Sequence, residues 1–107
     1  MEDAKYFNTL TGSFEEELLS CVDDVLSSLG LNIKSVIIFY LERKGVKFME
    51  IPNDPKRFSD FLREIYGGAA SVIERMIVKC LASKKGLVVS YTDFCSSLYE
   101  IKMKWEF

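Results

Sequence analysis

Short apolar segments with helical spacing, each bounded by a capping residue, glycine or proline, constrain the fold of this chain more than any other feature. The clearest segment runs from Ser13 to Gly30. Ser13 and Glu16 have the spacing of a capping box, in which each side chain accepts a hydrogen bond from a free backbone N–H. The apolar positions that follow are Phe14, Leu18, Val22, Val25, Leu26 and Leu29. They predict an amphipathic helix that Gly30 ends.

A second helix is predicted over residues 33–44, between Asn32 as its cap and Gly45 as its stop. Its run from Val36 to Leu41 is apolar all round, a pattern typical of a helix that is contacted on most sides. We therefore expect a central helix with Phe39 in the core, where Phe39→Ala would cost about 3 to 5 kcal/mol. A buried strand is the alternative because this run is rich in β-branched residues.

The middle of the chain also has prolines, glycines and capping residues between its apolar segments. Residues 46–51 alternate in part and are predicted as an extended connector or a short strand that Pro52 ends. Asp54 followed by Pro55 predicts the start of a helix, which the glycines at 67–68 end. A further helix is predicted from residue 69 to residue 85.

The last 21 residues fit two patterns. A period of two over residues 99–107 indicates a strand, and with residues 87–91 it would form a hairpin in an α+β fold. The positions Phe94, Leu98, Ile101 and Trp105 also match one helical face, behind a capping box at residues 90–93. The helix is favoured.

These segments are joined by short connections, which make consecutive helices neighbours. A chain of 107 residues has the usual size of one domain. We predict a mainly α fold, a compact bundle of about five short helices, in a single domain over residues 1–107. Residues 1–12 are predicted to be a flexible or extended arm.

Charge is unevenly distributed along the chain. Residues 1–30 carry a net charge of −6 and residues 31–107 a net charge of +4. This pattern indicates acidic and basic surfaces that complement each other within or between subunits, or two separate solvated faces.

The chain offers little for catalysis or for a cofactor. It contains no histidine, the commonest metal ligand and general base, and it lacks the phosphate-binding and nucleophile-elbow motifs. Cys21, Cys80 and Cys95 are too far apart in sequence for a zinc motif and are predicted to be reduced, buried side chains. We expect no catalytic, cofactor-binding or metal-binding residues, and a protein that is not an enzyme.

No apolar run reaches the length of about 18 to 20 residues that a membrane-spanning helix needs. The first residues are acidic, unlike those of a signal peptide. These features predict a soluble protein in the cytoplasm.

Residues 20–85 resemble a known family in their hydrophobic framework. The resemblance is carried by residues 33–37, 41–45, Glu50-Ile51-Pro52, Phe58, Phe61, Leu62, Ile65-Tyr66-Gly67, Ala69, Ile73-Glu74 and Ile77. This order is similar to the NitrOD class of small archaeal output domains. The resemblance implies a helical signalling module and provides no functional residue to transfer.

We therefore predict a regulatory or protein-interaction domain that acts by self-association or partner docking. The apolar C-terminal stretch is expected to form a homodimer interface. Its candidate residues are Tyr99, Ile101, Met103, Trp105 and Phe107. A nucleic-acid-binding regulator is the alternative, and an unrecognised enzyme is the third hypothesis. The basic residues behind the nucleic-acid alternative are Arg75, Lys79, Lys84, Lys85, Lys102 and Lys104.

Overall fold

The first helix of the computed structural model, which describes residues 12–105, begins at the predicted capping box. This helix is α2 (Phe14–Leu29). The Ser13 side-chain oxygen accepts from the Glu16 backbone N–H, and the Glu16 carboxylate accepts from the Ser13 N–H, both at 3.1 Å. Its buried residues are Phe14, Leu18, Cys21, Val22, Val25 and Leu26. The predicted amphipathic helix is confirmed.

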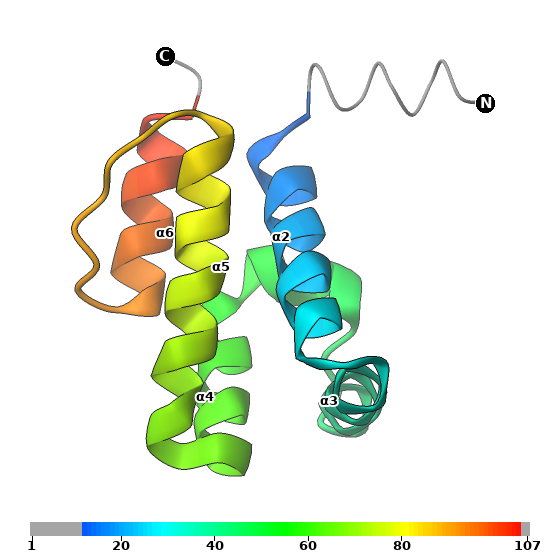
Figure 1. The fold of residues 1–107 in the computed structure, drawn as a ribbon. Coiled ribbons are helices and arrows are strands. Elements are labelled where there is room, and N and C mark those ends of the chain that lie inside the picture. The colour runs from blue at the N-terminus through cyan, green and yellow to red at the C-terminus, as the bar shows by residue number, and fades with distance from the viewer. Residues whose placement is uncertain (1–11, 106–107) are drawn as a thin grey trace.

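Four further α-helices and two short 3₁₀ helices follow in the described residues (Figure 1). They are α3 (Leu31–Arg43), η1 (Phe48–Asn53), α4 (Pro55–Tyr66), η2 (Gly67–Ala69), α5 (Ala70–Lys84) and α6 (Phe94–Met103). Helix α2 packs against α5 on one side and against α3 and η1 on the other, whereas α5 also packs against α4 and α6. The mainly α bundle of about five short helices is confirmed.

The second helix differs from the prediction in position and in burial. It starts at Leu31, directly after Gly30. The chain turns out of α2 at Gly30, which has a φ of 123°, a backbone conformation that favours glycine. Helix α3 packs mainly on α2 and η1, and Ile37 and Leu41 are its buried residues. Phe39 is 54% exposed. The prediction of a central helix is wrong. The apolar run places apolar residues on two faces of the helix, but only one of these faces packs against the rest of the protein.

The connector after α3 is also not extended. Residues 48–53 form η1, and Pro52 lies inside it, which a 3₁₀ turn tolerates because few of its N–H groups are needed. The predicted start of the next helix is confirmed. The Asp54 carboxylate accepts from the Arg57 N–H at 3.3 Å, and Pro55 opens α4.

Residues 94–103 form α6, so the helical interpretation of the C-terminal segment is confirmed for them and no strand occurs within residues 12–105. The cap is Asp93 alone, which accepts from the Ser96 N–H at 2.9 Å. Residues 87–91 have no regular structure, although Leu87, Val89 and Tyr91 are half-buried and alternate with exposed neighbours. The hairpin alternative depended on the period of two over residues 99–107, but residues 99–103 belong to α6 and provide no strand to pair with residues 87–91.

The predicted arm at residues 1–12 lies outside the described residues except for Gly12. The Gly12 carbonyl accepts a hydrogen bond from the Trp105 indole N–H at 3.3 Å. The start of α2 is thereby joined to the residues just after α6.

Two substitutions in α3 test its one-sided packing. We expect Ile37→Ala to lower the free energy of unfolding by about 2 to 5 kcal/mol, because the side chain is fully buried. Phe39→Ala should cost about 1 kcal/mol or less, because half of its side chain remains in water. Urea unfolding of dilute protein measures both, and equal losses would contradict the one-sided packing.

Candidate functional site

Three acids of α2 form ion pairs with three other helices. Lys34 of α3 pairs with Asp23. The Lys84 amine of α5 lies 3.1 Å from Glu17, and that hydrogen bond raises the pKa of Lys84. Lys102 of α6 pairs with Glu15 at 3.4 Å. The acidic first helix and the basic remainder of the chain therefore complement each other within one molecule.

Contacts with acidic or aromatic side chains also engage most of the basic residues considered for nucleic-acid binding. Lys84 and Lys102 are paired with α2, and Lys104 pairs with Glu100 at 3.1 Å. The Lys85 amine lies 4.9 Å from the centre of the Trp105 ring. Of the six candidates, Arg75, Lys79 and Lys85 form no ion pair with an acidic side chain within residues 12–105. Arg75, like Lys85, lies over an aromatic ring, that of Tyr91.

The structure separates the residues predicted to form an interface. Ile101 is fully buried, and Trp105 is 5% exposed and packs edge-on against Phe14 with ring centres 5.7 Å apart. Tyr99 and Met103 are exposed, four residues apart on the outer face of α6. Phe107 lies outside the described residues. Two of the five residues therefore share an accessible surface, and Ile101 and Trp105 instead hold α6 to the core.

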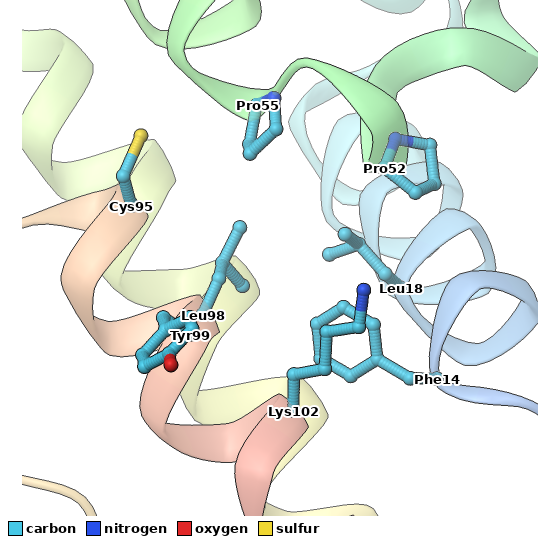
Figure 2. A pocket seen from close by; sticks show the side chains of 8 residues that line it. All are labelled: Phe14, Leu18, Pro52, Pro55, Cys95, Leu98, Tyr99 and Lys102. Atoms are coloured by element: carbon cyan, nitrogen blue, oxygen red, sulfur yellow. The ribbon is translucent and has the colours of Figure 1, made fainter.

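Tyr99 also lines a small pocket between α6, the start of α2 and the link from η1 to α4 (Figure 2). Its volume is about 190 Å³, below the roughly 300 to 1,000 Å³ of typical ligand sites. The lining residues are Phe14, Leu18, Pro52, Pro55, Cys95, Leu98, Tyr99 and Lys102. Lys102, its one charged residue, is paired with Glu15. The pocket has a volume close to that of one apolar side chain, and the Cys95 thiol that lines it has a pKa raised by burial.

The outer face of α3 is the largest set of exposed apolar residues on any described helix. We define it by Leu31, Ile33, Val36, Phe39 and Tyr40, each at least 41% exposed. The Phe39 and Tyr40 rings meet edge-on at 5.3 Å, and the Arg43 guanidinium lies 5.7 Å from the Phe39 ring centre. Three of these residues, Val36, Phe39 and Tyr40, belong to the run that was predicted to lie in a central, buried helix.

Sequence analysis missed one buried polar cluster completely. Glu74 of α5 is fully buried, and its carboxylate accepts a hydrogen bond from the Ser59 hydroxyl. It also accepts from the Arg63 guanidinium at 3.1 Å and from the Tyr91 hydroxyl at 3.4 Å. Burial and the nearby Glu74 charge raise the pKa of Tyr91, which keeps its phenol protonated as a donor.

Two of the three cysteines, Cys21 and Cys95, are in surroundings that disfavour the thiolate. Cys21 is buried and its pKa is raised, chiefly by that burial and then by the neighbouring Cys80 thiol. Burial also raises the pKa of Cys95. Thiolates are the reactive form, so these shifts lower reactivity at neutral pH. Residues 12–105 contain no group of three or more Cys, Asp or Glu side chains placed to hold a metal ion.

In comparisons with known proteins, the chain matches no family model, no curated protein and no solved structure. Among the described residues, no helix has both the length and the apolar character needed to cross a membrane.

The buried Glu74 provides a test of the polar cluster. We expect Glu74→Gln to lower the free energy of unfolding by about 2 kcal/mol, because a hydrogen bond to a charged group is worth about 1.5 to 3 kcal/mol. Arg63 is half-exposed and can turn to water when its partner is neutral. Urea unfolding measures the loss, and Glu42→Gln is the control, because Glu42 is exposed and forms no ion pair within residues 12–105. A stability equal to that of the wild type would contradict a stabilising role for the charge.

Proposed function

We propose that this protein is a small regulatory protein-interaction domain that self-associates through the outer face of α3 and catalyses no reaction. The exposed apolar residues of that face carry the proposal. Monomers seldom leave large apolar patches in water, and such patches mark binding surfaces.

The residue types of this face are those that interfaces favour. Aromatic residues and arginine are enriched at contact surfaces, and the face holds Phe39 and Tyr40 with Arg43 beside them. Ile33, Val36, Tyr40 and Arg43 follow one another at intervals of three, four and three residues. This spacing lines one side of a helix and suits packing against a second helix. An antiparallel contact between two copies of α3 about a two-fold axis uses the same face on each.

The outer face of α3 is better suited to this contact than the C-terminal segment. Ile101 and Trp105 are enclosed by their own chain, which leaves Tyr99 and Met103 as the exposed large apolar residues of α6. On α3, by contrast, the buried residues Ile37 and Leu41 lie on the side that packs on α2, and the opposite side is uncovered.

The size of α3 sets the expected strength of association. A helix of 13 residues is about 20 Å long. Two such helices bury less than the roughly 1,200 to 2,000 Å² of a stable interface. We therefore expect a weak dimer, with a Kd of about micromolar or weaker, whose population changes with protein concentration.

The resemblance of residues 20–85 to the NitrOD class is consistent with a regulatory module and stays a prediction, as does a cytoplasmic location. Nucleic-acid binding is less favoured, because ion pairs with acids occupy Lys84, Lys102 and Lys104. A basic surface that binds phosphates needs cations that are free to release counterions.

Light scattering across a concentration series tests the proposal. The wild type should be a dimer at high micromolar concentration and a monomer on dilution. The double variant Val36→Gln/Phe39→Gln should remain monomeric and folded, because glutamine keeps the helix propensity and removes the apolar contact.

The matched control is Met103→Gln, which removes an exposed apolar side chain from α6. It should dimerise like the wild type. A wild type that is monomeric at every concentration would contradict self-association, and loss of the dimer in Met103→Gln alone would place the interface on α6.

A further inference from the structure

The segment that joins α5 to α6 lies on the other side of the molecule from α3 (Figure 1). Its residues 87–91 lie against α5 there. A groove between the two has a volume of about 440 Å³, within the range of small-molecule sites. Its lining residues are Arg75, Val78, Lys79, Ala82, Ser83, Leu87, Val89 and Tyr91.

The groove has an aliphatic interior. Val78 and Ala82 of α5 are buried, and Leu87 and Val89 are half-buried against the core. An alkyl chain placed between them would move from water into a hydrocarbon environment. This transfer lowers the free energy of binding by about 0.8 kcal/mol for each buried CH₂ group.

Two cations lie at the same groove. Arg75 and Lys79 are four residues apart and therefore adjacent on one face of α5. Both are exposed, and within residues 12–105 neither forms an ion pair with an acidic side chain. The Arg75 guanidinium stacks on Tyr91, 4.6 Å from the ring centre. A contact with the ring face uses none of the N–H donors of the guanidinium, so they stay available for an anion.

Segment 87–91 forms the wall of the groove opposite α5, and hydrogen bonds at both of its ends anchor it. The Tyr91 hydroxyl bonds to the buried Glu74, whose charge is compensated by Arg63. At the other end of the segment, the Leu87 N–H bonds to the Ala82 carbonyl at 2.9 Å. The groove is therefore bounded by an anchored segment, so a ligand would not have to order it.

We propose that this groove binds a small aliphatic carboxylate, with the alkyl chain between Val78 and Val89 and the carboxylate at Arg75 and Lys79. The pairing of an aliphatic interior with two uncompensated cations selects for a molecule that has both an apolar and an anionic end. The planar guanidinium matches a carboxylate, which it can bind through two parallel hydrogen bonds.

Titration of ¹⁵N-labelled protein with octanoate, below the concentration at which it forms micelles, tests this site by NMR. Saturable shifts are expected within residues 75–91. Octylammonium has the same chain length and the opposite charge, and should bind at least tenfold more weakly. Arg75→Gln and Lys79→Gln should each weaken octanoate binding about tenfold, as expected for a lost hydrogen bond to a charged group.

Lys47→Gln is the control, because it removes an equal charge from an exposed position outside the groove; its affinity for octanoate should match that of the wild type. Arg75→Gln also removes the stacking on Tyr91, and Lys79→Gln keeps the test decisive if that variant loosens the segment. The proposal is overturned by non-saturable shifts, by shifts centred elsewhere, or by octylammonium binding as tightly as octanoate. Tighter binding of octyl phosphate at the same residues would overturn the carboxylate as the head group.

Discussion

Burial of the apolar face of α2 is the interaction on which the rest of this structure depends. Leu18, Cys21 and Val22 are completely buried, and α2 lies between α5 and α3 (Figure 1). A fully buried large apolar side chain contributes about 1.5 to 3 kcal/mol, whereas an exposed ion pair contributes about 1 kcal/mol or less. Hydrophobic packing thus supplies most of the stability, and the acids of α2 add contacts that favour the correct neighbours.

This arrangement also explains why α3 has an uncovered face. Helix α3 follows α2 directly through Gly30 and packs on it with one side. Helices α4, α5 and α6 pack mainly with one another and with α2. The apolar residues that define the outer face of α3 are therefore left 41% to 71% exposed. We propose that a second molecule of this protein packs against these residues.

Elements with local signals could be predicted from the sequence. The capping box at Ser13 and the Asp54-Pro55 pair place the starts of α2 and α4, because capping depends on residues three positions apart. The burial of α3 could not be predicted in this way. A continuous apolar run shows that a helix has apolar residues on two faces. Which of these faces the same chain covers depends on packing against elements that are distant in sequence.

The site residues show the same limit. Ile101 and Trp105 were predicted at an interface because their segment carries more apolar side chains than one face can bury, yet they pack into the core and leave Tyr99 and Met103 exposed. Glu74 had no local signal, since its partners Ser59, Arg63 and Tyr91 are 11 to 17 residues away. Arg75 and Lys79 were noticed as cations, but their groove exists only once segment 87–91 lies beside α5.

The central claim is that the outer face of α3 is a contact surface between two molecules. Amide hydrogen exchange followed by mass spectrometry at low and high protein concentration tests it most directly, because it reports where protection appears as well as whether it appears. The account predicts slower exchange at high concentration in peptides covering residues 31–43, with the α6 peptides unchanged. Exchange that is independent of concentration throughout the chain, or added protection confined to α6, would contradict it.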